Sequence, residues 1–352
     1  MNMTNRVQII CEETYLETIW CKALLGGLLK ELKKHRISFE LFHELNGMIA
    51  DQMVYVLGQS DEWLSQIVKK CNESGCVPVL LMPGTVNKVQ GQYHAIYPDL
   101  QNTLEHLKVM IESAGRSRVS LYGANMSVDL DRNRAEVFSE LVSRVEDIYP
   151  NVGSLEKCFR AFLPKADRYD VILCANGYAA VSLVKKLEKE KPDLLERVVV
   201  IAFEEVLKHS KYNQWISLVE LNLEEYGKTA LQLSELLGER NEVAAMTVRM
   251  KCNLCEIPEK QKEILELQSE KEMVFEDPEI VQMAKVEQLL READDLDHHI
   301  IAMLLENAKY SDIADSCYMT EGNVKYRVKK YMSVSDCHTK KELIELLQEY
   351  LQ

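Results

Sequence analysis

The chain has 352 residues, with 42 Lys and Arg against 56 Asp and Glu, and a formal net charge of −14. Such an acidic balance excludes a general binder of polyanions, whose surface must be basic over a large area. Apolar residues make up 47% of the chain and charged residues 28%, as in a soluble protein of two or three domains. No stretch approaches the ~18 apolar residues that a membrane helix needs.

The first ten residues and the cysteines predict a cytoplasmic protein. The opening residues, MNMTNRVQII, lack the apolar core of a signal peptide. Ten cysteines without regular spacing predict reduced thiols. Cys252-x-x-Cys255 has metal-like spacing, but with no second pair nearby we interpret these as ordinary strand-end residues and expect no metal and no cofactor.

No catalytic motif is present. The sequence has no P-loop, no glycine-rich dinucleotide fingerprint, no nucleophile elbow and no H-E-x-x-H motif. We therefore expect a protein that is not an enzyme.

The first 250 or so residues alternate between apolar runs and amphipathic stretches. Runs rich in β-branched residues predict strands at Arg6–Cys11, Ser38–His43, Gln52–Leu57, Val77–Met82, a short run ending near Tyr97, Arg118–Tyr122, Val171–Ala175 and Val198–Phe203. The helical period predicts helices at Thr18–His35, Ser60–Ser74, Asp99–Ala114, from near Arg132, and at Ala179–Glu190. This alternation predicts an α/β fold of two lobes, each a doubly wound parallel sheet.

Motifs along these strands follow an order typical of one family. They include the helix after Asp99 with RSRVSLYG behind it, RAEVF at Arg134–Phe138, DVILCANGYAAVSLV at Asp170–Val184 and ERVVVIAFEE at Glu196–Glu205. The ordered set, over about residues 6–254, resembles the effector-binding part of lactose-repressor-like regulators, which share the fold of periplasmic sugar-binding proteins. That family's usual helix-turn-helix precedes this part. Here the first strand already starts at residue 6, so we expect the DNA reader at the other end of the chain.

Ligands of open parallel sheets lie beyond the carboxyl ends of the strands, which in a two-lobed protein is the cleft between the lobes. The resemblance implies that Arg134, Asn176 and Glu204 contact a sugar. Their guanidinium, amide and carboxylate suit a row of hydroxyl groups. Tyr15, after the first strand, and Asp99 complete the candidate ligand-binding set.

Two of these residues have a structural alternative. Arg134 lies three residues after Asp131 and can form an ion pair with it, and Asp99 can be a helix N-cap. The family's Asn-Asp and Asp-Asp pairs are replaced by Asn-Gly at 176–177 and Glu-Glu at 204–205. The identity of the effector therefore stays open.

Between about Cys255 and Asp294 the composition shifts to Glu, Lys, Gln and Leu, without a strand-like run. Pro278 divides this segment into two predicted helices, Glu259–Met273 and Glu279–Ala293. The second carries an apolar stripe, which must be buried either on the chain's own domains or on a second copy. We favour the second copy and expect a homodimer.

Near the C-terminus a basic helix follows a shorter one. Thr320 is a good N-cap for TEGNVKYRVKKYM, in which Val324, Val328 and Tyr331 recur at helical spacing and predict a buried face. Four basic residues against one acid give this stretch a net charge of +3. Only Tyr318 and Met319 separate the shorter helix, Ser311–Cys317, from Thr320, so the pair predicts a helix-turn-helix.

The stretch IIAMLLENAKYSDIADSCYMTEGNVKYRVKKYM, Ile300–Met332, resembles the LuxR/NarL-type helix-turn-helix, with Asn307 in place of a glycine at a helix end. HTKKEL at His338–Leu343 stands where that family opens its fourth helix. The resemblance implies double-stranded operator DNA as a partner. The predicted DNA-binding residues are Thr320, Asn323, Lys325, Tyr326, Arg327, Lys329 and Lys330.

The sequence thus predicts a cytoplasmic one-component transcription regulator. Residues 1–255 would be a sensor for a small molecule, a sugar or derivative; residues 256–293 a helical linker; and residues 294–352 the DNA-binding domain. The alternative, from another class, is a cytoplasmic small-molecule-binding protein whose C-terminal helical tail docks on a partner protein. In that case the basic helix is only a solvated face. Neither interpretation requires contact with a membrane.

Overall fold

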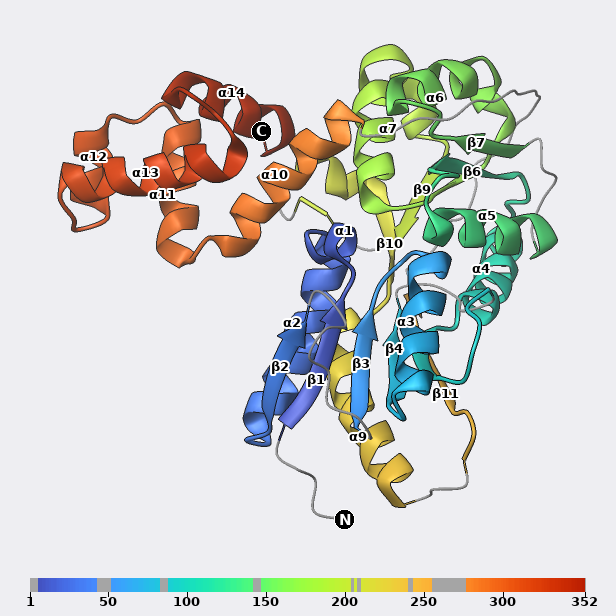
Figure 1. The fold of residues 1–352 in the computed structure, drawn as a ribbon. Coiled ribbons are helices and arrows are strands. Elements are labelled where there is room, and N and C mark those ends of the chain that lie inside the picture. The colour runs from blue at the N-terminus through green and yellow to red at the C-terminus, as the bar shows by residue number, and fades with distance from the viewer. Residues whose placement is uncertain are drawn as a thin grey trace. The chain divides into compact units, whose positions relative to one another are not determined.

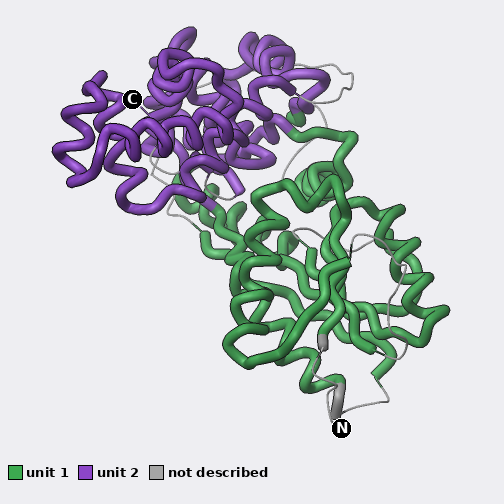
Figure 2. The backbone as a smooth tube through the Cα atoms, turned by 60° about the vertical axis from the view of Figure 1, so that its left-hand side comes forward, with its two compact units in different colours: residues 1–115, 124–148, 219–255 green, residues 116–123, 149–218, 256–352 purple. Residues whose placement is uncertain are grey.

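The computed structural model describes residues 6–42, 52–82, 88–141, 147–203, 206–207, 210–239, 243–254 and 277–351. The backbone forms two compact units, which Figure 2 colours separately. Unit 1 comprises residues 1–115, 124–148 and 219–255, and unit 2 comprises residues 116–123, 149–218 and 256–352. The chain passes between the units several times, so each unit is assembled from separate segments of sequence.

The first sheet has six strands in the order β11-β5-β4-β3-β1-β2 (Figure 1). All its neighbouring strands pair in parallel, for example Ile10 opposite Val56. Its strands are β1 (Arg6–Cys11), β2 (Ser38–Phe42), β3 (Met53–Leu57), β4 (Val77–Leu81), β5 (His94–Pro98) and β11 (Thr247–Met250). Consecutive residues of the central strands are buried, as expected of a parallel sheet covered on both faces.

The helices of unit 1 are α1 (Glu13–Leu16), α2 (Ile19–Lys34), α3 (Asp61–Glu73), α4 (Leu100–Ser113), α5 (Asp129–Leu141) and α9 (Tyr226–Glu239), with a 3-10 turn η4 (Leu223–Glu225). Thr18 caps α2 by accepting a hydrogen bond from the Cys21 N–H at 3.1 Å. Helices α2 and α9 meet at Gly27 and Gly227. A Cβ atom on Gly27 would lie 2.1 Å from the Glu224 carbonyl oxygen, so this close approach requires glycine.

The second sheet follows the order β12-β10-β9-β8-β6-β7. It contains β6 (Val119–Ala124), β7 (Ile148–Pro150), β8 (Val171–Cys174), β9 (Val199–Phe203), β10 (Ile216–Glu220) and β12 (Asn253–Leu254). Strands β6, β8 and β9 pair in parallel, whereas β12 pairs with β10 antiparallel. Its surrounding helices are α6 (Leu155–Phe162), α7 (Gly177–Glu190) and α8 (Pro192–Leu195), with 3-10 segments η2 (Leu163–Arg168) and η3 (Lys211–Trp215).

The C-terminal part of unit 2 is helical (Figure 1). It contains α10 (Pro278–Glu292), α11 (Asp295–Leu305), α12 (Tyr310–Ser316), α13 (Glu321–Ser335) and α14 (Lys340–Leu351). Asp294 and Asp297 form a capping box at the start of α11. Asn307, in the left-handed region with φ of 59°, ends that helix in the role usually taken by glycine.

The α/β class with two parallel-sheet sets and a helical C-terminal region confirms the predicted fold class. Helix α6 and the short strands β10, β11 and β12 were not predicted from the sequence. The predicted helix Glu259–Met273 lies outside the described residues. Within the residues that are described, no helix is both long and apolar enough to span a membrane.

The apolar stripe of the linker helix is buried within the chain itself. Met283, Val286 and Leu290 of α10 are buried, and α10 packs against α13 and α7 of the same unit. Asp277, the N-cap residue of α10, accepts a hydrogen bond from the N–H of Leu155, the first residue of α6, at 2.5 Å. Of the two alternatives left open by the sequence, the structure therefore supports burial on the chain's own domains. The homodimer stays a prediction, and this stripe no longer provides an argument for it.

Candidate ligand site and candidate DNA-binding face

Helix α13 has one buried face and one basic exposed face. The Thr320 hydroxyl accepts a hydrogen bond from the Asn323 N–H at 3.3 Å and so caps the helix. Val324, Val328 and Tyr331 are all at most 1% exposed. The predicted helical phase is therefore confirmed, and it places the basic side chains on the opposite side.

The exposed face of α13 combines cations with an aromatic ring. Lys329 and Lys330 are exposed, and Tyr326 is 74% exposed although large apolar rings are usually covered. Lys325 forms an ion pair of 2.9 Å with Glu321, one helical turn earlier, and its ammonium lies 5.8 Å from the centre of the Tyr310 ring. We call Lys325, Tyr326, Lys329 and Lys330 the basic face.

The turn between α12 and α13 exposes a tyrosine that is not among the predicted DNA-binding residues. Tyr318 is 98% exposed and has a φ of 52°, in the left-handed region where a large side chain is strained. The Met319 N–H donates to the Ala314 carbonyl at 3.0 Å, a bond that closes the end of α12. Glycine is the usual residue at such a helix end. The tyrosine in its place could therefore have been recognised from the sequence as a candidate functional residue.

Arg327, predicted to bind DNA, is engaged inside the domain. Its guanidinium forms ion pairs with Asp294, at 3.1 Å, and with Asp297, and the Tyr331 hydroxyl donates to Asp297 at 2.5 Å. Burial opposes ionisation of Asp297, but the bonds from Tyr331 and Arg327 hold its pKa below the ordinary value. In this structure Arg327 therefore fastens α13 to α11.

Two predicted ligand residues of unit 1 lie in its interior. Tyr15, after β1, is fully buried, and burial raises its pKa well above the ordinary value while the nearby Arg134 charge partly opposes this. Arg134 is 2% exposed, with Nη1 at 3.6 Å from Asp131 Oδ1. The structural alternative considered for Arg134, an ion pair with Asp131, is thus present.

Asp131 is a buried carboxyl with few compensating bonds. It accepts a hydrogen bond from the Asn125 N–H at 2.9 Å, and it faces Arg134. Burial raises its pKa above the ordinary value despite these two interactions. The ligand-binding role of Arg134 stays a prediction.

The loop after β3 is held by carboxylates from other segments of unit 1. Glu12 Oε2 accepts hydrogen bonds from the N–H groups of Gln59, at 2.8 Å, and Ser60, at 3.2 Å. The Asp129 carboxylate accepts one from the Asp61 N–H at 2.9 Å. These bonds fix the backbone at the carboxyl ends of β1 and β3, where the fold predicts a ligand.

Asp99 and Asn176 stand at helix starts. Asp99 occupies the N-cap position of α4 without a capping side-chain bond, and its carboxylate lies 3.8 Å from Arg249 of β11. Asn176 caps α7, because its side-chain oxygen accepts a hydrogen bond from the Ala179 N–H at 3.0 Å. Glu204 lies outside the described residues. The assignment of these residues to an effector therefore stays a prediction.

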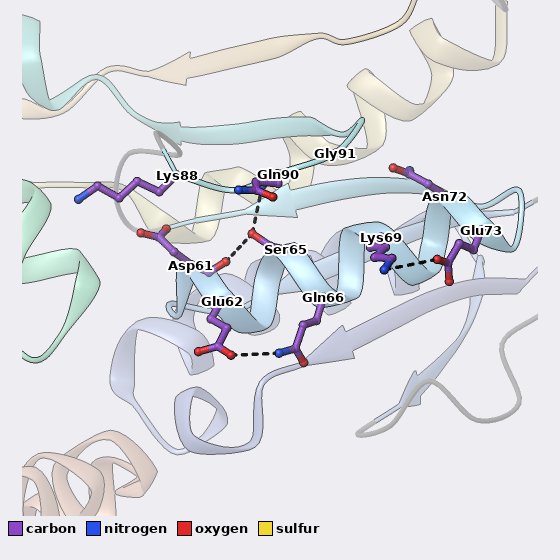
Figure 3. A pocket seen from close by; sticks show the side chains of 10 residues that line it. All are labelled: Asp61, Glu62, Ser65, Gln66, Lys69, Asn72, Glu73, Lys88, Gln90 and Gly91. Carbon is purple, nitrogen blue, oxygen red and sulfur yellow. Dashed lines mark hydrogen bonds and ion pairs between the residues drawn. The ribbon is translucent and has the colours of Figure 1, made fainter.

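A polar groove of about 820 Å³ runs along α3 rather than at the strand ends (Figure 3). Ser65 donates to the Asp61 carbonyl at 2.7 Å and accepts from the Gln90 N–H at 3.1 Å, so residues 88–91 form its second wall. Among the described residues, no predicted effector ligand lines this groove. No group of three or more potential metal ligands occurs in the described part of the chain either.

No protein-family model matches the chain, and no curated protein matches its sequence. Solved structures do match. They include the transcriptional regulator CelR in complex with cellobiose, at 15% identity, a TM-score of 0.57 and coverage of 71% of this chain and 83% of that one.

A LacI family regulator, CcpA from Weissella paramesenteroides with bound sucrose, matches at 12% identity and a TM-score of 0.55, covering 72% and 98% of the two chains. A LacI family regulator from Clostridium acetobutylicum matches at 12% identity and a TM-score of 0.54, covering 71% and 98%. At such low identities the likeness concerns the fold. The two-lobed α/β part is therefore similar in fold to LacI-family transcription regulators.

Proposed function

We propose that the protein is a cytoplasmic transcription regulator that senses a small molecule and binds operator DNA through α11–α14. In this proposal residues 1–255 form the sensor, residues 256–293 the linker and residues 294–352 a LuxR-type helix-turn-helix domain. The sensor fold is similar to that of regulators whose structures contain cellobiose and sucrose, which supports a sugar or sugar derivative as the effector.

The observation that carries the proposal is the two-sided construction of α13. Its buried residues hold it in the domain, while its basic face is exposed together with the neighbouring Tyr318. A helix that presents lysines and tyrosines after a short turn can enter the major groove and reach base edges and phosphates. With a chain charge of −14, such a local patch is compatible with binding at selected sites.

The test is binding to genomic fragments enriched by the wild-type protein, measured by fluorescence anisotropy at fixed salt. Lys329→Ala should weaken specific binding by ~1–3 kcal/mol and relax sequence preference, because Lys329 lies on the basic face without an acidic neighbour one turn before it. We expect Tyr318→Ala to weaken binding with little change of preference, as for a phosphate contact.

A matched control is Lys69→Ala, which removes the same charge from an exposed position of α3 in unit 1. Its binding should equal that of wild type. Equal affinity and preference for Lys329→Ala, Lys69→Ala and wild type would show that α13 does not read DNA. If no fragment is enriched at all, the alternative function is favoured, in which the helical tail docks on a partner protein.

We also propose that the protein binds DNA as a homodimer. A single helix-turn-helix makes few contacts, and two half-sites about one helical turn apart give the usual affinity. Light scattering of the free protein and of its DNA complex measures this directly, since a dimer has twice the 40.5 kDa chain mass. A monomer in both samples contradicts it.

A further inference from the structure

Three helices of the C-terminal region meet around one aromatic ring, that of Tyr310. Tyr310 is the first residue of α12 and is half-buried. The Nζ atom of Lys325, from α13, lies 5.8 Å from the centre of this ring, and the Nζ atom of Lys340, from α14, lies 4.5 Å from it. We call these three residues the Tyr310 cluster. They belong to the part of unit 2 that Figure 1 draws in orange and red.

Lys340 is held in place by two contacts. Its ammonium donates a hydrogen bond to the Ala308 carbonyl at 3.1 Å. The face of the Tyr310 ring carries partial negative charge and attracts the same ammonium. An ammonium has three N–H donors, so these contacts leave at least one donor for a further acceptor. The side chain is therefore positioned but not saturated.

Within the described residues, no carboxylate forms an ion pair with Lys340. The next lysine, Lys341, is 85% exposed and pairs with Glu345 at 3.1 Å. Glu342, the nearest acid along the chain, accepts a hydrogen bond from the His338 N–H at 2.7 Å and so caps the start of α14. This helix end is already occupied by a carboxylate. An anion at Lys340 would therefore be bound by side chains and not by the helix N-terminus.

Lys325 joins the Tyr310 cluster to the basic face, of which it is a member. It forms an ion pair with Glu321, and both side chains are about half exposed, at 53% and 51%. Exposed pairs of this kind contribute little to stability, so an incoming anion can take the place of Glu321. The ammonium groups of Lys325 and Lys340 thus form a cationic extension of the basic face, supported by one ring.

The ligand that suits two such ammonium groups is a phosphate. Like charges held near one ring repel each other, and an anion that contacts both removes this repulsion. Phosphate oxygens accept strong, charge-assisted hydrogen bonds, and lysine binds phosphate as a point charge. Each strand of DNA carries one phosphate per ~3.4 Å of helix axis. The two ammonium groups can therefore contact neighbouring phosphates of one strand.

We propose that the Tyr310 cluster is a phosphate-binding site that contacts the DNA backbone beside the groove that α13 enters. The proposal rests on the proposed function in taking DNA as the source of the phosphates. Tyr310 is a positioning residue, because its ring holds the two ammonium groups near each other. Phosphates are the same in every sequence, so the cluster contributes affinity and orientation but no sequence preference. In this it differs from Lys329, to which we assign a part of the preference.

The experiment measures how DNA affinity of the full chain depends on salt, on fragments enriched by the wild-type protein. Lys340→Gln keeps a hydrogen-bond donor and removes the charge. The slope of log K against log salt concentration should become shallower by about 0.9, the value for one lost phosphate contact, with unchanged sequence preference. Lys340→Arg should restore the slope. Lys341→Gln removes the same charge one residue away and is the matched control, which should keep the wild-type slope. If Lys340→Gln fails to fold, Tyr310→Leu decides, since it keeps both charges and should weaken binding without changing preference.

The same salt slope for Lys340→Gln, Lys341→Gln and wild type overturns the inference and leaves the proposed function standing. If no DNA fragment is enriched, the proposed function fails, and a titration with inorganic phosphate at constant ionic strength decides the inference instead. Amide NMR shifts of residues 309–311 and 339–341 are its readout. Saturable shifts in wild type and Lys341→Gln that are lost in Lys340→Gln support a site for another phosphate-bearing ligand. Shifts that are absent from wild type, or that persist in Lys340→Gln, overturn it.

Discussion

Two Arg–Asp pairs, one in each unit, differ in how well the carboxylate is compensated. Arg327 and Tyr331 both bond Asp297, whose pKa is lowered. Asp131 lies 3.6 Å from Arg134 and accepts a hydrogen bond from the Asn125 N–H, and its pKa is raised. The first pair is a satisfied structural contact. In the second pair the effect of burial on the carboxyl outweighs the interactions that favour its ionised form.

Of the variants that test this comparison, Asp297→Asn should have the largest effect on stability. The change weakens the bonds to Arg327 and Tyr331 and leaves Arg327 with the more exposed Asp294, so we expect a loss of about 2–4 kcal/mol in the free energy of unfolding of α11–α14. Urea unfolding followed by circular dichroism measures it. Asp295→Asn, an exposed neighbour on the same helix, is the control and should change stability little.

A smaller effect is expected for Arg134→Lys, which keeps the charge beside Asp131 but removes the planar fork. If Arg134 binds the effector, a sugar that raises the melting temperature of wild type should lose ~1–3 kcal/mol of binding free energy in the variant. A thermal-shift screen of sugars, sugar phosphates and polyols, including cellobiose and sucrose, provides the measurement. A hit that stabilises both proteins equally makes Arg134 a purely structural residue.

The smallest expected effect concerns how the free energy of unfolding changes with pH. The sign of this change differs between the two pairs. The pKa of Asp131 is raised in the folded protein, so the folded state binds more protons above the ordinary value of 3.8. Its contribution to stability therefore falls as pH rises through that window. The pKa of Asp297 is lowered, so its contribution is present above 3.8 and is lost as pH falls below it.

Urea unfolding from about pH 3 to about pH 6 tests these signs. The contribution of Asp131 to stability falls as pH rises, and Asp131→Asn removes it. The stability of this variant should therefore increase more steeply with pH than that of wild type. Asp297→Asn should lose less stability than wild type at the acid end. The same slope for all three proteins would contradict the comparison.

Local pattern was enough to predict much of the fold. The spacing of Val324, Val328 and Tyr331 fixes the buried face of α13 without reference to any other segment. Continuous apolar runs such as those of β3 and β9 likewise identify buried strands. Strands β10 and β11 were not predicted because many of their residues are only half-buried. Helix α6 was not predicted because its eight residues give too short a periodic pattern.

Partners distant in sequence could not be predicted. Arg327 looks like part of a basic helix until Asp297, 30 residues earlier, is brought beside it. The Leu207 N–H donates a hydrogen bond to Glu287 of α10, 80 residues later, and nothing in either local sequence indicates this bond. The sequence showed that the apolar stripe of α10 must be buried either on the chain's own domains or on a second copy. The choice between these two depends on tertiary packing.

The bond between Asp277 and Leu155 also bears on how the chain is made. The two residues are 122 positions apart, and they join α6 to a helix that is synthesised much later. At ordinary rates of translation, Leu155 waits roughly ten seconds or more for Asp277 to leave the ribosome. Unit 2 is therefore completed late in synthesis, and nascent chains that stop before residue 277 should remain sensitive to protease around α6.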